Sequence, residues 1–300
     1  MIHATRLTKR YGSILALQDL NLTVPDGAVF GLLGPNGAGK TTFLRLAVGL
    51  LFPDSGQISL GQCPPYQVGY LPERPHFPGS FRVGEYLVTA GRVGGLDRYG
   101  ARQTARRALE QTGLSLLAER RIASCSKGML QRLGVAQALL LDPPLLLLDE
   151  PLDGLDPAAQ AAMRQLIQLL GQAGRTVLVC THRLSDVTQM CTHVGILAQG
   201  RLVRTGSMAE LTTPRSQVSI VSDPLPEGLT QHLSRIHPQL MISGNQVILP
   251  GDALEAKSAV LRLLLDAGLQ IWRLEQQKAT LEEIYLDAIR SQPPAGERLT

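Results

Sequence analysis

The chain has 300 residues, of which 44% are hydrophobic and 18% are charged, and it carries a formal net charge of +4 at a pI near 9.0. This composition excludes a disordered chain and predicts a globular protein with a large core and more than one domain. No run of 18 apolar residues occurs, the first residues lack the apolar segment of a signal peptide, and no aromatic residues alternate with basic ones. We therefore expect no membrane span, no secretory leader and no nucleic acid partner.

The first chemical pattern along the chain is a glycine-rich loop. Residues 34–41 fit G-x-x-x-x-G-K-[ST] and lie between an apolar segment at 28–33 and a helix-like segment at 42–48, which is the strand, loop and helix context that the motif requires. Glycines let backbone N–H groups converge on phosphate oxygens, and the positive end of the following helix adds to that field. We predict that Lys40 contacts the β- and γ-phosphates and that the Thr41 hydroxyl is a magnesium ligand.

A helical stretch interrupts the alternation of strands and helices from about residue 82 to 141. Helices are predicted over 83–92, 101–112 and 127–141, with glycines between them. The rest of the first 211 residues alternates strands and helices, which predicts a mostly parallel sheet covered on both faces. The helical stretch is therefore predicted to be a subdomain inserted between two strands of that sheet.

Two later strands end in titratable residues. The segment 145–148 is apolar on both faces, as in a central strand, and ends in Asp149 and Glu150. The segment 176–180 also reads as a buried strand and is followed by Thr181 and His182. Because parallel sheets bind ligands at the carboxyl ends of their strands, this edge predicts metal and water chemistry.

The order of elements changes beyond residue 213. Strands are predicted near 217–221, 240–242, 246–249 and 270–274, with helices at 229–236, 253–267 and 280–289. The order β-α-β-β-α-β is that of a ferredoxin-like module. It indicates either a ligand-sensing domain or an appendage that stabilises packing or dimers. The domains are thus predicted as 1–213, with the helical subdomain inside it, 214–290, and a flexible tail at 291–300.

Together these motifs make residues 1–211 similar to the ATP-binding cassette subunit of an ABC transporter. The resemblance implies a P-loop NTPase fold, α/β with a mixed or parallel sheet, and ATP and Mg²⁺ as cofactors. It implies that Tyr11 stacks on adenine, that Glu73 occupies the Q-loop position and that residues 154–156 form the D-loop. The implied nucleotide-binding set is Tyr11, Gly34, Pro35, Asn36, Gly37, Ala38, Gly39, Lys40, Thr41, Thr42, Glu73, Ser126, Lys127, Gly128 and Asp156.

The resemblance also assigns catalytic tasks. Lys40 holds the phosphates, Glu150 polarises the attacking water and His182 contacts the γ-phosphate, while Thr41, Glu73 and Asp149 are expected at the metal. The signature turn Ser126, Lys127 and Gly128 begins a helix and offers amides and a dipole to an anion, which in the family belongs to the opposite subunit. With one P-loop and one signature in this chain, a second cassette is predicted, with a homodimer favoured and a heterodimer left open.

Two departures from the common pattern indicate a subtype. Lys127 replaces the first glycine of the signature, and Glu73 stands where many cassettes have glutamine. The forms SKGM and GYLPE resemble cassettes that serve exporters with a separate permease. We predict such an ATPase in the cytoplasm, peripheral at the inner face of the cell membrane, with a permease helix docked beside Glu73. The alternatives are an importer ATPase, a soluble ABC ATPase of translation or DNA repair, and a nucleotide-sensing adaptor without activity.

Overall fold

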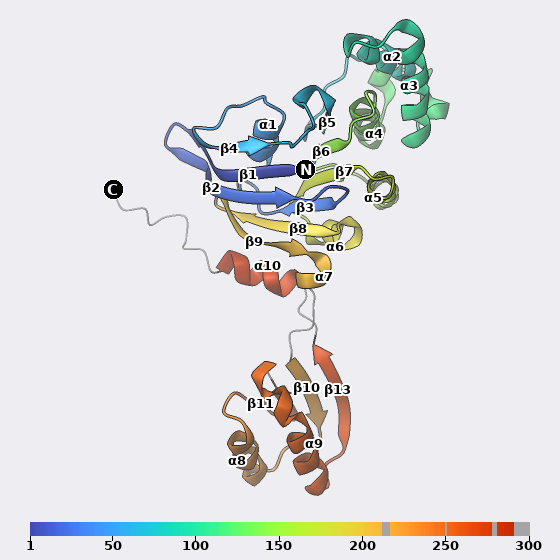
Figure 1. Ribbon diagram of the computed structural model, residues 1–300. Coiled ribbons are helices and arrows are strands. Elements are labelled where there is room, and N and C mark those ends of the chain that lie inside the picture. Colours follow the sequence, from blue (N-terminus) through green and yellow to red (C-terminus); the bar gives the residue numbers. More distant parts are fainter. Residues whose placement is uncertain (212–216, 250, 278–280, 291–300) are drawn as a thin grey trace. The chain divides into compact units, whose positions relative to one another are not determined.

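The structure is a computed structural model that describes residues 1–211, 217–249, 251–277 and 281–290 (Figure 1). The chain divides into two compact units, the first made of Met1–Met208 with the C-terminal residues from Tyr285, and the second of Ala209–Ile284. The predicted second domain, 214–290, included the last helix, whereas most of that helix groups with the first unit. The predicted boundary at 213 and the predicted tail at 291–300 lie outside the described residues.

A six-stranded sheet is the centre of the first unit, in the order β5-β6-β7-β3-β8-β9. All neighbours pair in parallel except β8 and β9, which form an antiparallel edge. Every residue of β3, β6 and β7 is buried, which explains why these strands are apolar on both faces. The strands are β3 (Val29–Leu33), β5 (Val68–Leu71), β6 (Leu145–Asp149), β7 (Thr176–Thr181), β8 (His193–Ala198) and β9 (Arg201–Ser207).

A second, antiparallel sheet covers one face of the central sheet, and the sequence did not predict it. It has the order β2-β1-β4, with β1 at Ile2–Tyr11, β2 at Ile14–Val24 and β4 at Ser55–Ser59. Its apolar side chains share one core with helix α1 (Lys40–Ala47) and with inward-facing residues of β3 and β6. This layer places the β1–β2 hairpin beside the glycine-rich loop, where Gly39 approaches the Ala16 carbonyl.

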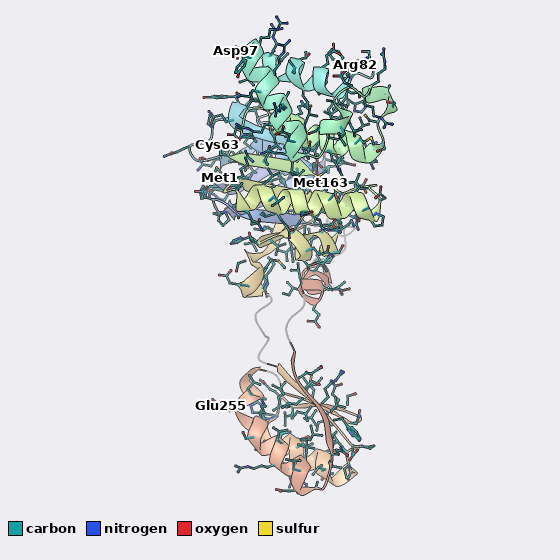
Figure 2. The ribbon with its side chains drawn as sticks, turned by 90° about the vertical axis from the view of Figure 1, so that its right-hand side faces the viewer. Met1, Cys63, Arg82, Asp97, Met163 and Glu255 are labelled. Carbon is teal, nitrogen blue, oxygen red and sulfur yellow. The ribbon has the colours of Figure 1, made fainter. Side chains whose placement is uncertain are left out.

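Helices α5 (Pro157–Gln172) and α6 (Leu184–Met190) belong to the other side of the central sheet. Helix α5 buries Met163, Leu166, Ile167 and Leu170 along one stripe, and Met163 is labelled on this helix in Figure 2. The helix begins at Asp156, whose side chain accepts a hydrogen bond from the backbone N–H of Ala159. A short 3₁₀ turn (Pro65–Gln67) and helix α7 (Met208–Leu211) complete the connections.

The inserted helices have a core of their own. Helices α2 (Val83–Val93), α3 (Arg98–Gln111) and α4 (Lys127–Ala138) pack around a separate apolar cluster that includes Leu87 and Leu133. Two 3₁₀ turns, Ser115–Leu117 and Ile122–Ser124, connect α3 to α4. In Figures 1 and 2 these helices stand beyond the sheet edge formed by β5, as a distinct lobe of the first unit.

The second unit contains an antiparallel four-stranded sheet in the order β11-β12-β10-β13. Its elements follow in the predicted order β-α-β-β-α-β, and its core contains Ile220, Leu233, Val247, Val260 and Leu264. One helix differs, because the segment predicted as 253–267 begins as a 3₁₀ turn. The bounds are β10 (Gln217–Ser222), α8 (Glu227–Ile236), β11 (Met241–Ser243), β12 (Gln246–Leu249), a 3₁₀ turn (Gly251–Ala256), α9 (Lys257–Asp266) and β13 (Ile271–Gln277). The last helix, α10 (Leu281–Arg290), groups with the first unit from Tyr285 on.

Candidate active site

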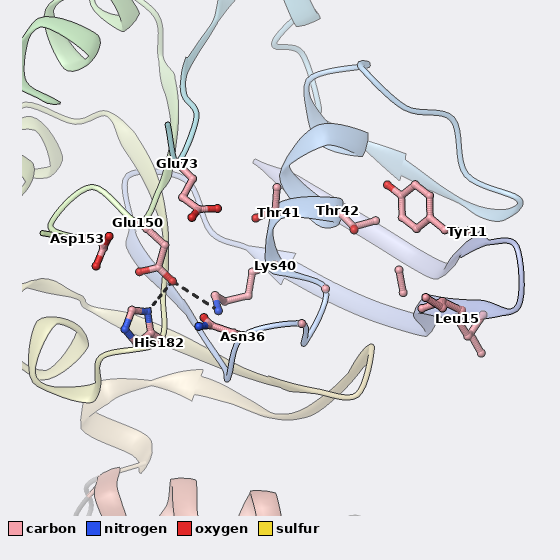
Figure 3. A pocket seen from close by; sticks show the side chains of 14 residues that line it. Tyr11, Leu15, Asn36, Lys40, Thr41, Thr42, Glu73, Glu150, Asp153 and His182 are labelled. Atoms are coloured by element: carbon pink, nitrogen blue, oxygen red, sulfur yellow. Dashed lines mark hydrogen bonds and ion pairs between the residues drawn. The ribbon is translucent and has the colours of Figure 1, made fainter. Parts of the chain in front are cut away.

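A cavity of about 580 Å³ lies where the carboxyl ends of the central strands meet the glycine-rich loop (Figure 3). It brings together side chains from segments that are far apart in the sequence. Five groups of predicted site residues share it: the loop, the acidic strand end, the histidine after β7, Tyr11 and Glu73. The lining is Tyr11, Ile14, Leu15, Ala16, Asn36, Gly37, Gly39, Lys40, Thr41, Thr42, Glu73, Glu150, Asp153 and His182.

The shape of the loop depends on two glycines. A Cβ on Gly34 would lie 2.2 Å from the Leu197 carbonyl oxygen, so a larger residue would push the loop away from β8. Gly39 has φ +108°, a conformation that L-residues avoid, and a Cβ there would lie 2.4 Å from the Ala16 carbonyl oxygen. The chain therefore bends tightly into α1, and the first N–H groups of that helix have no partner within the helix.

The Lys40 side chain lies on the floor of the cavity and is 6% exposed. Its ammonium group donates to the carbonyl oxygens of Gly34 at 2.7 Å and Pro35 at 3.2 Å. It also lies 3.6 Å from Oε1 of Glu150, as drawn in Figure 3. The cation is thus fixed between the phosphate loop and the acidic strand end, where it can bind an anion.

Asp149 and Thr41 form a polar pair that fits a magnesium ion. Thr41 donates to Oδ2 of the fully buried Asp149 at 2.8 Å, whereas Oδ1 has no hydrogen-bond partner among the described residues. Burial, together with the nearby charges of Glu150 and Glu73, raises the pKa of Asp149 to about 6 against the opposing effect of the Thr41 hydrogen bond. A divalent cation would pair the orphaned oxygen and stabilise the ionised form.

A magnesium ion bound at Asp149 and Thr41 would need further ligands from the nucleotide. Within the residues that the structure describes, no group of three or more His, Cys, Asp or Glu side chains could hold a metal. This suits Mg²⁺, which commonly binds through one or two protein oxygens plus substrate phosphates and water. Glu73, the third predicted ligand, lines the cavity but is exposed, and its carboxylate lies 3.8 Å from Nε of Arg74.

Glu150 is held in an unusual backbone conformation. Its φ is +46°, and its backbone N–H donates to the Cys180 carbonyl oxygen on β7 at 2.9 Å. A non-glycine residue in this region carries strain of about 1–2 kcal/mol, which such positions accept most often at functional sites. The conformation turns the side chain away from the line of β6, so that Oε1 lies 2.9 Å from Nδ1 of His182. Because an ionised carboxylate only accepts hydrogen bonds, Nδ1 is the donor in that state.

The signature residues and Asp156 do not line this cavity. Ser126 caps α4 by accepting a hydrogen bond from the Met129 N–H, and Asp156 caps α5. Both side chains and that of Lys127 are exposed, with Nζ of Lys127 3.3 Å from Oδ2 of Asp153. The structure therefore divides the segment 126–156, because Glu150 and Asp153 line the chain's own cavity whereas the signature residues do not.

Four lining residues were not among the predicted ones. Asp153 lies between Glu150 and the predicted D-loop, and its position close to that carboxylate was the available signal. Ile14, Leu15 and Ala16 come from the β1–β2 hairpin. No motif marks them, because they reach the cavity only through the unpredicted antiparallel sheet. Tyr11, from the end of the same hairpin, lies at the rim and is 43% exposed.

Comparison with known proteins agrees with this geometry. A profile of the family described as ABC transporter matches residues 17–153. Over 298 residues the chain is 33% identical to the uncharacterised ABC transporter ATP-binding protein YxlF of Bacillus subtilis, covering 97% of this chain and 100% of that relative. This chain belongs to the family of ABC transporter ATP-binding proteins.

Two further relatives are also named as ATP-binding proteins. The Nod factor export ATP-binding protein I of Burkholderia lata is 34% identical over 288 residues, which cover 93% of each chain. An uncharacterised ABC transporter ATP-binding protein of Nostoc is 42% identical over 208 residues, 66% of this chain. The aligned part is 62% of the Nostoc protein, so this ABC chain spans less than two thirds of that relative.

Solved ABC cassettes have the same fold. An ATP-binding subunit of an ABC transporter matches with a TM-score of 0.63 and 29% identity, covering 70% of this chain and 91% of that one. CbiO1 of Clostridium perfringens, part of the transporter complex CbiONQ, matches with a TM-score of 0.63 and 27% identity over 70% and 89% of the two chains. These matches confirm the predicted P-loop α/β core. In the described part of this ABC protein no helix is long and apolar enough to cross a bilayer.

Proposed function

We propose that this ABC protein is the ATP-hydrolysing subunit of an exporter, acting with a separate permease at the inner face of the cell membrane. The observation that carries the proposal is the convergence of a phosphate loop and a carboxylate–imidazole pair on one cavity, with the buried Asp149 bonded to the lining residue Thr41. The family binds and hydrolyses ATP, and its ATP-binding subunits work with permeases, so the geometry and the family point to the same activity.

In this mechanism each side chain has one task. Lys40 and the loop N–H groups bind the phosphates, because phosphoryl transfer depends on positioned positive charge. Thr41 and Asp149 would hold Mg²⁺, which would neutralise the charge that develops on the phosphate oxygens. Glu150 accepts a proton from the attacking water, and His182 fixes the orientation of that carboxylate through the 2.9 Å contact.

Adenine recognition is assigned to the β1–β2 hairpin. Tyr11 at the cavity rim and the apolar Ile14 and Leu15 lie on this hairpin beside the phosphate loop. An exposed aromatic ring stacks readily on a nucleobase, because every base has a π face. The bound nucleotide would then cover Tyr11, whose ring is otherwise open to solvent.

A second cassette completes the site in this proposal. Ser126, Lys127 and Gly128 begin helix α4 outside the chain's own cavity, at a helix N-terminus that favours anions. One chain therefore offers one phosphate loop and one separate signature turn. Two copies related by a twofold axis can each lend the signature to the other, and we favour a homodimer on this ground.

Export is favoured over import by a relative whose name states export and which matches nearly the whole chain. The Nod factor export protein aligns over 93% of this chain, which includes the second unit, whereas the solved cassettes cover about 70%. The sequence forms SKGM and GYLPE resemble those of exporter-type cassettes, which also favours export. The direction of transport and the substrate depend on the permease.

We assign the docking surface for the permease to the helical lobe. A groove of about 840 Å³ lies along helices α2 and α3, and its lining combines apolar Val88, Ala105 and Leu109 with arginines and glutamates. The segment after Glu73 is tied to α2 through Tyr86, whose ring meets Phe77 and Phe81 edge to face at 5.3 and 6.2 Å between centroids. A short amphipathic permease helix fits such a groove, and Glu73 would report the nucleotide state to it.

The test of the activity is Glu150→Gln. Loss of a general base costs about 10²- to 10⁴-fold in rate, so the variant should bind ATP as tightly as the wild type but barely hydrolyse it. The matched control is Glu110→Gln on the surface of α3, where the carboxylate pairs with Arg106 and does not line the cavity. Undiminished hydrolysis by Glu150→Gln would remove this residue from its role.

The test of the transporter assignment is partner dependence. The tagged full chain should co-purify with an integral membrane protein from the cells that make it, and reversing charge in the groove with Arg102→Glu should break that association while leaving ATP binding intact. Recovery of the chain on ribosomes or DNA without a membrane protein would contradict the proposal.

A further inference from the structure

A bridge of polar side chains lies behind His182 and joins helix α5 to the start of α6. Nε2 of Gln160 donates to the Leu155 carbonyl oxygen at 2.9 Å. Oε1 of the same side chain accepts a hydrogen bond from Nη2 of Arg183 at 3.3 Å. One glutamine therefore connects the loop that follows Glu150 with the residue that follows His182.

A buried carboxylate anchors the bridge. Asp186 is 1% exposed, and its Oδ1 accepts a hydrogen bond from Nη1 of Arg164 on α5 at 3.2 Å. Its Oδ2 lies 3.5 Å from Nε of Arg183 and makes no hydrogen bond within the described residues. A buried charge that loses its partner is strongly unfavourable, so Asp186 restrains the guanidinium of Arg183 beside Gln160.

A hydrogen bond between the two neighbours of His182 also fixes the backbone that carries it. The N–H of Arg183 donates to Oγ1 of the buried Thr181 at 3.1 Å, which shapes the turn that carries the imidazole. The imidazole then meets Glu150 at 2.9 Å. The contacts close a ring that runs from Glu150 through the loop at 151–155, Gln160 and Arg183 back to His182.

We propose that Gln160 and Arg183 are positioning residues that hold His182 at Glu150 and couple its position to the loop at 151–155. The inference rests on the proposed ATPase function and adds residues to which no motif points. Neither residue lines the cavity, so both act on the hydrolytic step and leave ATP binding unchanged. Asp153 of the same loop does line the cavity, so a change there would reach His182 through the bridge.

The first test separates binding from turnover in the full-length protein. Gln160→Leu removes both bridge contacts and should lower kcat roughly 10-fold, because small misplacements of catalytic groups cost one to two orders of magnitude. KM for ATP and the affinity for a fluorescent ATP analogue should stay within about twofold, which follows from the position of Gln160 outside the cavity. Equal loss in kcat and in ATP affinity would overturn the proposal.

Two further variants exclude a merely structural effect. Gln168 on α5 makes a similar hydrogen bond to the Gln189 carbonyl oxygen on α6 at 2.8 Å, away from the loop, and Gln168→Leu should leave kcat unchanged. Gln160→Glu keeps the acceptor for Arg183 but loses the donor to Leu155, so it should show the same kcat loss as Gln160→Leu. Full activity of Gln160→Glu would overturn the link to the loop.

The decisive readout is a double-mutant cycle measured in single-turnover hydrolysis. If the bridge acts through His182, Gln160→Leu should have no further effect on the rate once His182→Ala is present. Multiplicative effects of the two changes would show that the bridge acts independently and would overturn the inference. A wild-type chain without any ATPase activity would instead contradict the proposed function, so the two failures are distinguishable.

Discussion

At the scale of single residues, Asp149 is a fully buried carboxylate that contacts the cavity-lining Thr41. The carboxyl is buried, one of its oxygens has a hydrogen bond from Thr41, and the other has no hydrogen-bond partner in the described structure. Its raised pKa of about 6 follows mainly from burial. The residue is therefore arranged for a bound cation at the expense of the empty protein's stability.

The pH dependence of stability follows from that pKa. Between its ordinary value of 3.8 and about 6 the folded protein keeps a proton that the unfolded chain has released, so the free energy of unfolding falls as pH rises through this window. The loss above pH 6 amounts to at most about 3 kcal/mol. In chelator and without nucleotide, Asp149→Asn should be more stable than the wild type at pH 7.5 and lose this advantage near pH 4.

Urea unfolding at the two pH values checks this prediction, with Asp153→Asn as the control because Asp153 is exposed. The same Asp149→Asn variant should bind Mg²⁺ with ATP more weakly. If the difference in stability between the wild type and Asp149→Asn were the same at both pH values, the raised pKa of the buried carboxyl would be contradicted.

Sequence reasoning at this scale reached the residues that lie in contiguous motifs. The phosphate loop, Asp149 with Glu150, and His182 could be predicted because each follows a recognisable strand. The bridge through Gln160 and Arg183 could not, because both residues look like ordinary polar positions of helices and turns. Only the packing of α5 against α6 brings them together.

At the scale of elements, the phosphate loop depends on close approach as well as on backbone freedom. Gly34 has no positive φ, and its requirement comes from the Leu197 carbonyl of β8. Gly37 has φ +81°, and a Cβ there would have no neighbouring atom within 4 Å. Glycine is therefore needed at this position for its backbone conformation alone. These two glycines therefore allow the two effects to be measured separately.

Replacing each of these glycines by alanine should give different losses of stability. Gly34→Ala forces the loop away from β8, an overpacking that costs about 2–3 kcal/mol, whereas Gly37→Ala costs about 1 kcal/mol from backbone strain. Denaturant unfolding of the nucleotide-free protein measures both values. The steric explanation would be wrong if Gly34→Ala were no more destabilising than Gly37→Ala.

The elements themselves could be predicted unevenly from sequence. The buried strands β3, β6 and β7 are visible as apolar runs between turns, and the helices of the lobe follow their apolar period. The sheet β2-β1-β4 could not be foreseen, since β1 pairs with β4 about 50 residues further along the chain and no local signal specifies that register. Residues 253–256, the later part of the 3₁₀ turn at Gly251–Ala256, are predicted from sequence as the start of an α-helix, because their apolar spacing fits both forms.

At the scale of the whole molecule, the second unit has an apolar cluster of its own, and among the described residues this cluster shares none with the two clusters given above for the first unit. Leu264 is fully buried there, and Leu264→Ala should cost about 2–5 kcal/mol. Trp272 on β13 is the single tryptophan of the sequence, so its fluorescence reports the unfolding of this unit alone. We expect the fluorescence transition to move to lower urea while the affinity for ATP stays unchanged.

Leu87→Ala, in the separate core of the helical lobe, is the matched control, and it should leave the tryptophan transition in place. A loss of ATP affinity that follows the tryptophan transition in Leu264→Ala would show instead that the two units unfold as one.

The central claim at this scale is that the segment 126–156 serves two different ATP sites in a dimer. Ser126→Arg should disable the signature turn and Glu150→Gln the chain's own cavity, so each variant alone should be inactive. In a mixed dimer the intact cavity of one chain faces the intact signature of the other. An equal mixture should therefore recover roughly a quarter of the wild-type ATPase activity, since about half of the dimers are mixed and each has one complete site. A mixture no more active than the two separate variants would contradict the claim.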